Sequence, residues 1–303
     1  MGRQEVAGEA SWLPNAIRSG NRRYRFPILP PRGKTDMTFK QTVTLLFALV
    51  AAAFATASSA KTDDDHDRKS QCTNASLRGT YGFVARGTTL AGSPLPAALQ
   101  GPFASGGVST FDGQGNVFLT STSSFNGVIQ PVEVRGTYQV NSDCSYTSQV
   151  ENGIAFRAVI VDGGRELLIL QTTPAVVISG TAIQRSPRCE NKPFQGIYGF
   201  AAEGAAGPPT IPAKLAGPLA GVGTVAFERD GTFVLVATRS VNGAIDPEPL
   251  ALTGVYSMNS DCTFGMIFDV GFTFDAVIVN GGKEILFVET DPGTALIVKA
   301  KKI

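Results

Sequence analysis

The sequence predicts an all-β protein made of two tandem antiparallel meander β-barrels of about eight strands each, with one disulfide per barrel. The first supporting observation is an internal repeat: a Gly-x-Tyr-Gly-Phe motif, an Asn-Gly pair, an Asn-Ser-Asp-Cys tetrapeptide and a Gly-Gly pair each return after 116 to 118 residues. The second is the pattern within each copy, where short runs rich in Val, Thr, Phe and Tyr alternate with turn dipeptides. No long stretch of helical periodicity interrupts them, which argues against parallel βαβ connections.

Residues 37–60 have the pattern of a secretory signal peptide and precede both copies of the repeat. A basic start at Lys40 is followed by an apolar run over residues 43–55 and by small residues up to Ala60. The apolar run is shorter than the ~20 residues of a membrane span. We therefore expect a secreted or periplasmic protein with no membrane span after signal cleavage, and an uncleaved N-terminal anchor is the alternative.

The other N-terminal residues are not expected to belong to the fold. Residues 1–36 precede a complete signal and are interpreted as a mis-assigned N-terminal extension, whereas residues 61–71 are expected to form a disordered acidic tail. Eight of the 26 Lys and Arg residues and three of the 25 Asp and Glu residues precede Lys61, which leaves 18 basic and 22 acidic side chains in the mature chain. This balance provides no basic field for nucleic acid or for an anionic membrane.

All four cysteines lie in the repeated part, one pair per copy at matched positions. In an exported protein this pattern predicts two disulfides, whereas four free thiols would need a reducing compartment. Of the three connectivities, the duplication favours Cys72–Cys144 and Cys189–Cys262, because each copy must have folded alone before it was doubled. Each bridge closes a loop of about 70 residues and stabilises the fold by about 4 kcal/mol in the chain-entropy model.

The first copy divides into eight strand-like runs separated by turn residues. Pairs such as Asp112–Gly113 and Asn126–Gly127 supply the positive φ that tight hairpins need. The strands are expected near residues 79–87, 102–111, 116–125, 132–140, 145–151, 155–162, 166–172 and 175–184.

Strands joined mostly by short hairpins form a meander, and a meander of about eight strands removes its exposed edges by closing into a barrel. A two-sheet sandwich is the alternative, but it usually needs long crossovers, and each copy has only one long connection. We expect barrel domains over residues 72–186 and 187–303, with a short Pro-containing linker between them.

The long connection joins the first two strands of each copy and is apolar and rich in proline. It covers residues 90–100 in the first copy and 205–215 in the second. Such a loop either folds over the mouth of the barrel as a lid or packs on the wall. Leu95 and Ile211, in these loops, are candidate ligand-binding residues.

The order of the motifs resembles that of a group of exported bacterial proteins of uncharacterised function. The motifs are G-x-Y-G-F, F-D-G-x-G, an N-G turn, G-T-Y-x-V-N-x-D-C and V-D-G-G-x-E-L. This resemblance covers residues 72–185 and 189–303 and implies tandem β-barrels of the allene-oxide-cyclase-like and lipocalin-like (calycin) type. The second copy departs from the pattern at residues 227–231 and has Asn280 in place of Asp162. No cyclase catalytic residue matches, so the resemblance implies no activity.

The repeated part is poor in residues that carry catalysis. The only histidine, His66, lies in the tail, the cysteines are assigned to disulfides, and no nucleophile elbow, P-loop or dinucleotide fingerprint occurs. No cofactor and no metal site are therefore expected. Matched acids could act in acid–base chemistry if they pointed into a barrel, and are otherwise ordinary solvated side chains. These acids are Glu151 and Asp269, expected in strands, and Glu166 and Glu284, which follow the Gly-Gly turns.

Two tyrosines per copy are the only aromatic hydroxyls that both copies share. They are Tyr81, Tyr138, Tyr198 and Tyr256. A core tyrosine with a satisfied hydroxyl is the default interpretation, and a hydrogen bond to a ligand is the alternative, which makes them candidate ligand-binding residues.

The leading functional hypothesis is an exported non-enzymatic binding protein that holds a small apolar ligand in one or both barrels. An eight-stranded barrel is either filled by its own side chains or holds one small ligand. The second hypothesis is a structural or cell-surface interaction protein with solid barrels, whose protein partner the sequence does not identify. The third, a cyclase- or isomerase-like enzyme, requires a carboxylate or a tyrosine pair inside a cavity.

Overall fold

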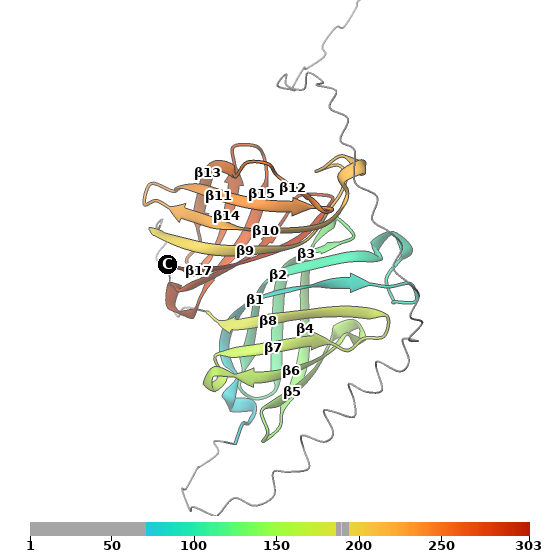
Figure 1. The fold of residues 1–303 in the computed structure, drawn as a ribbon. Helices are drawn as coiled ribbons and strands as arrows, with labels where there is room; N and C mark the ends of the chain where they lie inside the picture. The colour runs from blue at the N-terminus through green and yellow to red at the C-terminus, as the bar shows by residue number, and fades with distance from the viewer. Residues whose placement is uncertain (1–70, 186–188, 190–193) are drawn as a thin grey trace, which may run out of the picture. The chain divides into compact units, whose positions relative to one another are not determined.

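A computed structural model describes residues 71–185, 189 and 194–303 of the chain. The expected N-terminal extension, signal peptide and nearly all of the acidic tail lie outside the described residues, as does the linker at 186–188. The described part contains two antiparallel β-barrels, one in each copy of the repeat (Figure 1). The predicted fold class, with eight main strands and one disulfide per barrel, is confirmed.

Barrel 1 is a closed meander in which every strand pairs with its neighbours in sequence. Its strands are β1 (Arg78–Thr89), β2 (Gly101–Asp112), β3 (Asn116–Phe125), β4 (Val128–Val140), β5 (Ser145–Val150), β6 (Ala155–Val161), β7 (Glu166–Gln171) and β8 (Val176–Gln184). Its short 3-10 turns are η1 (Asn74–Ser76), η2 (Ala97–Leu99), η3 (Glu151–Gly153) and η4 (Asp162–Gly164). The barrel closes where β1 pairs with β8. The strand starting near residue 132 was predicted too short: it begins at Val128, because Asn126 and Gly127 form a two-residue hairpin with positive φ.

Barrel 2 repeats this meander with one addition. Its strands are β9 (Gly196–Ala206), β10 (Gly217–Phe227), β11 (Thr232–Val241), β12 (Ala244–Ile245), β13 (Leu250–Met258), β14 (Thr263–Phe268), β15 (Thr273–Val279), β16 (Glu284–Glu289) and β17 (Thr294–Lys302). Its 3-10 turns are η5 (Ala213–Leu215) and η6 (Asn280–Gly282). Pairing of β9 with both β10 and β17 closes the barrel, and β10 also pairs with β11.

The short β12 reflects a local difference between the copies. The single strand β4 of barrel 1 corresponds to β12 and β13 of barrel 2, which are separated by an Asp-Pro-Glu-Pro segment at residues 246–249. Pro247 matches Pro131, which β4 accommodates. The second copy is two residues longer here and adds Pro249, which has no N–H to donate to a sheet, so the strand is interrupted. The interruption places Asp246 beside Arg239 of β11, with Nε and Oδ2 2.6 Å apart.

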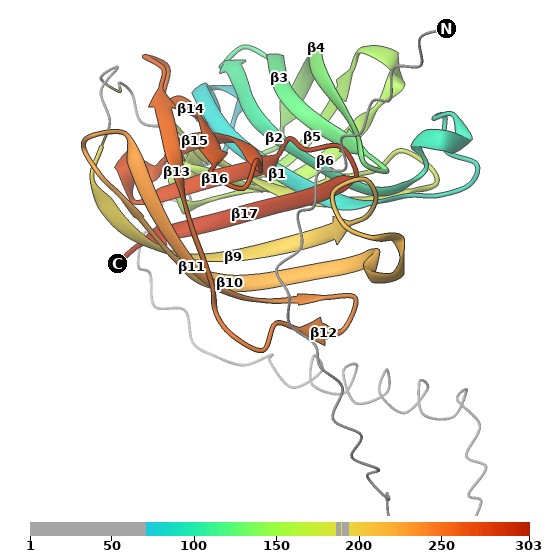
Figure 2. The ribbon, with the colours of Figure 1, turned by 90° about the horizontal axis from the view of Figure 1, so that it is seen from above.

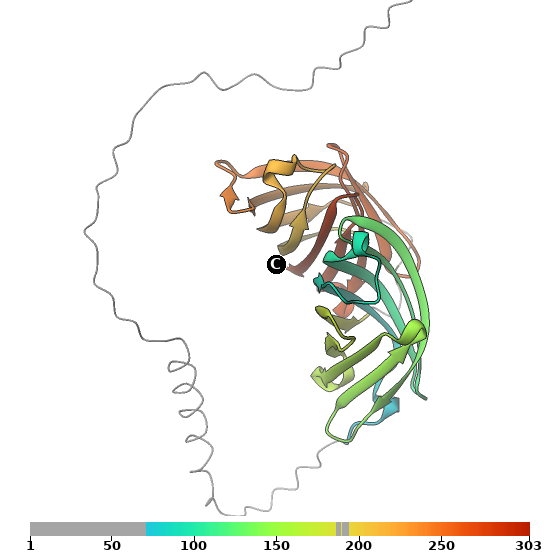
Figure 3. The ribbon, with the colours of Figure 1, turned by 90° about the vertical axis from the view of Figure 1, so that its right-hand side faces the viewer.

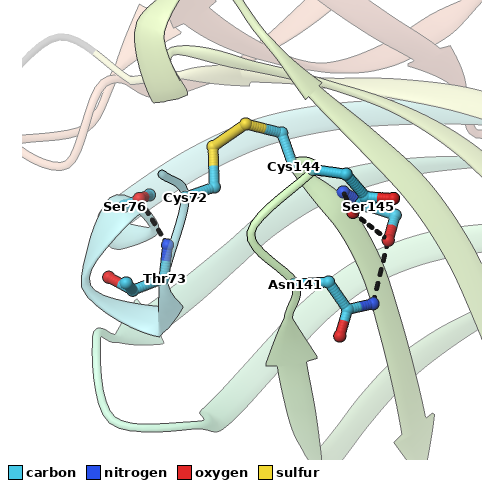
Figure 4. Close-up of a disulfide and its surroundings, with 7 residues drawn as sticks. Cys72, Thr73, Ser76, Asn141, Cys144 and Ser145 are labelled. Atoms are coloured by element: carbon cyan, nitrogen blue, oxygen red, sulfur yellow. Dashed lines mark hydrogen bonds between the residues drawn. A yellow bond between two sulfur atoms is a disulfide. The ribbon is translucent and has the colours of Figure 1, made fainter. Parts of the chain in front are cut away.

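The disulfides Cys72–Cys144 and Cys189–Cys262 fasten the chain segment before the first strand of each barrel to a hairpin. Figure 4 shows the first of them. In barrel 1 the hairpin is the β4–β5 turn, where Ser145 N donates to Asp143 Oδ1 at 3.0 Å. Asn141 Nδ2 donates to Ser145 Oγ at 2.8 Å in the same turn. The connectivity expected from the duplication is therefore present.

The two barrels pack through the outer faces of particular strands. Side chains alternate between the interior and the exterior along each strand, so in β16 Ile285 and Phe287 belong to the core of barrel 2 while Leu286 and Val288 point outwards. Strands β16 and β17 lie beside β1 and β2 (Figure 2). The buried residues of this interface are Val84, Ala104, Ile183, Val277, Val279, Leu286, Val288, Ala295 and Ile297.

Two glycines of barrel 1 allow this close approach. A Cβ atom at Gly82 would lie 2.6 Å from side-chain carbons of Val277 and Val279, and one at Gly106 would lie 2.8 Å from Val288. Real Cβ atoms essentially never come this close to another heavy atom. Glycine is therefore required at both positions for the observed interface.

The outer face of barrel 2 that is covered in this interface has an uncovered counterpart in barrel 1. Val277, Leu286 and Val288 are 1 to 2% exposed. The equivalent residues of barrel 1, 118 positions earlier, are Val159, Leu168 and Leu170, which are 50 to 52% exposed. Val159 and Leu168 pair directly across β6 and β7. The contact between the barrels is therefore head to tail, with different faces of the same unit in contact.

Candidate functional site

Each barrel has two different ends. The closed end carries the disulfide, the segment that precedes the first strand and the β2–β3, β4–β5 and β6–β7 turns, or their barrel 2 equivalents. The mouth carries the long loop between the first two strands and the remaining turns. In Figure 3 these long loops, teal in barrel 1 and gold in barrel 2, lie at the ends of their strands. This division determines where a ligand could enter.

The shared tyrosines of barrel 1 lie at its closed end. Tyr81 Oη donates to the carbonyl of Gly164 at 2.5 Å, and Tyr138 Oη donates to the carbonyl of Leu77 at 2.9 Å. Leu77 is completely buried and fills this end. Burial is the first cause that raises the pKa of both tyrosines. The two hydroxyls hold turn and terminal backbone in place, and neither residue lines the cavity described below.

Barrel 2 repeats the arrangement at its own closed end. Tyr198 Oη donates to the carbonyl of Gly282 at 2.8 Å, and Tyr256 Oη donates to the carbonyl of Phe194 at 2.5 Å. The ring of Phe194 occupies the position of Leu77 and packs on Phe227 with centroids 4.7 Å apart. Burial raises the pKa of Tyr256 to about 12. These tyrosines also lie away from the cavity of their barrel.

Barrel 1 encloses a cavity of about 210 Å³ on the mouth side of this plug. Most of its wall is apolar, formed by residues such as Phe83, Phe156 and Ile178. The polar part is a group of inward-facing hydroxyls, in which Ser105 Oγ and Ser123 Oγ are 2.8 Å apart. No charged side chain lines this cavity, which is therefore a neutral, hydroxyl-bearing site.

Barrel 2 encloses a smaller cavity of about 130 Å³ at the equivalent place. Its wall carries more aromatic and aliphatic volume because most serines of barrel 1 are replaced by larger or apolar residues. The equivalent pairs are Ser105 and Gly221, Ser109 and Val225, Ser121 and Ala237, Ser123 and Arg239, and Ser148 and Met266. Two charged residues, Arg239 and Glu289, line this cavity.

The long loops reach both cavities at the mouth. Leu95 lines the cavity of barrel 1, and Ile211 lines that of barrel 2. The first loop is held by Gln100 Nε2, which donates to the carbonyl of Leu95 at 2.9 Å. The second is held by Thr210 Oγ1, which donates to the carbonyl of Pro292 at 2.5 Å. Both loops thus form part of the cavity wall at its entrance.

Glu289 is the one acid in the described residues that is both deeply buried and in contact with a cavity. It is 6% exposed. The pKa of its carboxyl group is raised to about 8, mainly by burial and also by the nearby Asp291, while a hydrogen bond from Thr294 and the charge of Arg239 oppose the shift. The carboxyl group therefore stays mostly protonated at neutral pH while the cavity is empty.

The acids singled out in the sequence lie elsewhere. Glu151 and Asp269 were expected in strands, but they occupy exposed turns after β5 and β14. Glu166 accepts a hydrogen bond from Thr181 Oγ1 at 2.9 Å, and neither Glu166 nor Glu284 lines a barrel cavity. Within the described ranges, no group of three or more His, Cys, Asp or Glu side chains is arranged to hold a metal ion. The same residues contain no helix long and apolar enough to cross a membrane.

Sequence reasoning missed Glu289 because it concentrated on residues that both copies share. Barrel 1 has Gln171 at this position, also lining its cavity. Strand alternation could have found the residue, since Glu289 follows Ile285 and Phe287 on the inward face of β16. An acid in that register is predicted to point into the barrel.

Comparisons with known proteins add no functional assignment. No protein-family model and no curated protein matches the chain. Among solved structures, isotype 1 transferrin-binding protein B from serogroup B Neisseria meningitidis is similar at 8% identity, with a TM-score of 0.25 over 75% of this chain and 77% of that one. The Myxococcus xanthus hemagglutinin in complex with a mannopentaose is similar at 14% identity, with a TM-score of 0.14 over 73% of this chain and all of the other. At such low TM-scores neither likeness supports an argument about function.

Proposed function

We propose that this protein is an exported, non-enzymatic binding protein that holds a small apolar ligand in one or both barrels. The observation that carries the proposal is the presence of a mainly apolar cavity at the mouth side of each barrel. A barrel filled by its own side chains would have no such space. The two disulfides suit an oxidising compartment, and export itself rests on the signal-like residues 37–60.

The size of the cavities limits the ligand. An apolar protein cavity of about 150 Å³ is known to hold a benzene molecule. The cavities of 130 and 210 Å³ therefore suit a single ring or a short branched chain rather than a fatty acid or a steroid. Transfer of such a ligand from water into the cavity contributes a favourable binding free energy of about 25 cal/mol per Å² of apolar surface buried.

Binding of toluene, a neutral single-ring probe, tests this proposal. The oxidised full chain should show a rise in melting temperature with toluene concentration, because a ligand that binds only the folded state stabilises it. Ala85 and Ala202 occupy equivalent inward positions in the two cavities. Phenylalanine at either position should fill one cavity and remove its share of binding, and filling both should abolish it. A toluene response that survives in the double variant would contradict the proposal.

A surface-interaction role is the second candidate. It is favoured by the exposed apolar side chains Val159, Leu168 and Leu170, because the equivalent face of barrel 2 is covered by another barrel. Lysine at Leu168 and Leu170 should then abolish attachment of the purified protein to bacterial cell envelopes and leave toluene binding unchanged. Equal attachment of the variant and the wild type would count against this role.

A further inference from the structure

We propose that the cavity of barrel 2 selects an apolar ligand that carries one basic amino group, with the carboxylate of Glu289 as its counter-ion, whereas the cavity of barrel 1 takes uncharged ligands. This inference rests on the proposed binding function and assigns a ligand class to one of its two sites. It follows from what differs between the two copies, since the shared residues build the barrel and its closed end.

The position of Glu289 meets the first requirement, a carboxyl group inside the cavity. Glu289 is the last residue of β16, and Phe287, two residues earlier on the same strand face, also lines the cavity. The remaining wall consists largely of aromatic and aliphatic side chains such as Phe200, Leu252 and Phe274. A ligand that fills this space brings its polar group close to the carboxyl group.

The charges around Glu289 favour a cation. Arg239 of β11 is the single basic side chain in the wall, and its Nε is already paired with Asp246 at 2.6 Å. Asp291, in the β16–β17 turn, accepts a hydrogen bond from Thr273 N at 2.8 Å and is close enough to raise the pKa of Glu289. The lining residues from β9, β10, β13, β14, β15, β17 and the long loop are uncharged. With Arg239 paired to Asp246, the wall has no second basic side chain that could pair with the carboxyl group of Glu289.

An ammonium group is the cation that fits an apolar cavity of this size. A buried charge is tolerated only when it is paired, and a bound ammonium group supplies the missing partner of the carboxylate. In the empty cavity burial holds the pKa of Glu289 at about 8, so the group carries a proton at pH 7. A bound cation favours the carboxylate form, so Glu289 releases its proton to the buffer as the amine binds.

The duplication provides the matched variant. Barrel 1 has Gln171 where barrel 2 has Glu289, so glutamine is compatible with the fold at this register. The variant Glu289→Gln removes the counter-ion and keeps a side chain of nearly the same shape. The variant Glu248→Gln removes the same charge from an exposed residue of the nearby Asp-Pro-Glu-Pro segment. It serves as the control for long-range attraction.

Calorimetric titration of the oxidised full chain with benzylamine, toluene and benzoate tests the inference. In the Ala85→Phe background, which leaves only the barrel 2 cavity open, benzylamine should bind at pH 7 with release of roughly one proton, measured from titrations in two buffers of different ionisation enthalpy. Glu289→Gln should lower the ratio of benzylamine affinity to toluene affinity by about thirtyfold or more. Glu248→Gln should bind benzylamine as the wild type does. The reverse variant Gln171→Glu should give benzylamine binding to barrel 1 when Ala202→Phe blocks barrel 2.

The outcomes separate this inference from the function on which it rests. If toluene binds but benzylamine binds equally to the wild type and to Glu289→Gln, the amine assignment fails and the binding function stands. Tighter binding of benzoate than of benzylamine, or an equal loss in Glu248→Gln, would also overturn it. If none of the three probes binds either barrel, the binding function itself fails. Should Glu289→Gln not fold, the result with Gln171→Glu decides.

Discussion

The buried carboxyl group of Glu289 should make the stability of the protein depend on pH, and Glu289→Gln should remove that dependence. The pKa of Glu289 is raised from 4.5 to about 8 in the folded chain. Below pH 4.5 both the folded and the unfolded chain carry the proton, so the ionisation of Glu289 does not reduce the free energy of unfolding. Between pH 4.5 and 8 the unfolded chain loses the proton and the folded chain keeps it, so stability falls as pH rises.

The magnitude follows from the size of this shift. Each unit of difference between the folded and unfolded pKa changes the free energy of unfolding by about 1.4 kcal/mol. The expected loss is about 3 kcal/mol between pH 4 and pH 7, and about 5 kcal/mol when both states are ionised above pH 8. Natural domains are stable by about 5–15 kcal/mol, so the effect is a large part of the total.

Urea unfolding of the wild type and of Glu289→Gln from pH 4 to pH 9 measures the effect. Near-ultraviolet circular dichroism of the buried tyrosines is the suitable signal, because the only tryptophan, Trp12, lies outside the described residues. Subtracting the free energies of unfolding of the two proteins at each pH removes the contribution of every group that titrates in both. Glu248→Gln, which removes an exposed carboxyl group, should run parallel to the wild type. Parallel curves for the wild type and Glu289→Gln between pH 5 and 8 would refute the assignment of a buried, protonated carboxyl group.

Three further predictions concern the scaffold. Replacing both Cys72 and Cys144 with serine should lower the free energy of unfolding of barrel 1 by about 4 kcal/mol, because the lost bridge spans 72 residues. A urea midpoint equal to that of the oxidised wild type would contradict this. Gly82→Val should cost about 1–3 kcal/mol in the same assay because it meets Val277. Gly199→Val, at the equivalent position of barrel 2, should be nearly neutral, because a Cβ there would make only ordinary contacts with Ile303. Equal costs would show that the interface is not the cause. Tyr81→Phe should cost about 1–3 kcal/mol by leaving a buried carbonyl unpaired, with the loss absent if that carbonyl finds another donor.

The fold could be predicted from the sequence because two independent copies carry the same turn signals. Asn-Gly and Asp-Gly pairs supply positive φ, so they locate hairpins, and the duplication of the cysteines favours one of the three possible disulfide pairings. The start of β4 at Val128 was missed because Pro131, in the middle of this strand, resembles a strand boundary. Pro131 is tolerated there because β4 pairs with β5 only over residues 136–140, so at Pro131 the strand has a paired neighbour on one side alone.

The cavities could not be predicted in the same way. Their volume depends on how side chains from many strands meet across the barrel, as with Ser148 in barrel 1 and Met266 in barrel 2. A repeat draws attention to what the copies share, which here is the closed end with its tyrosines. The candidate site lies where the copies differ, and Glu289 was overlooked for that reason. In this duplicated protein the residues that build the fold are shared by the two copies, whereas the residues that distinguish the two cavities are not.

The head-to-tail contact between the barrels has a consequence for assembly. A contact between different faces of one unit does not close on itself, so identical units joined in this way would grow into a filament. Barrel 2 carries Val222 where barrel 1 has Gly106, and this valine is 62% exposed. At Gly106 even a single added carbon would lie 2.8 Å from the neighbouring barrel, so Val222 bars the same contact with a third unit. The side chain of Val222 therefore limits the head-to-tail array to two barrels.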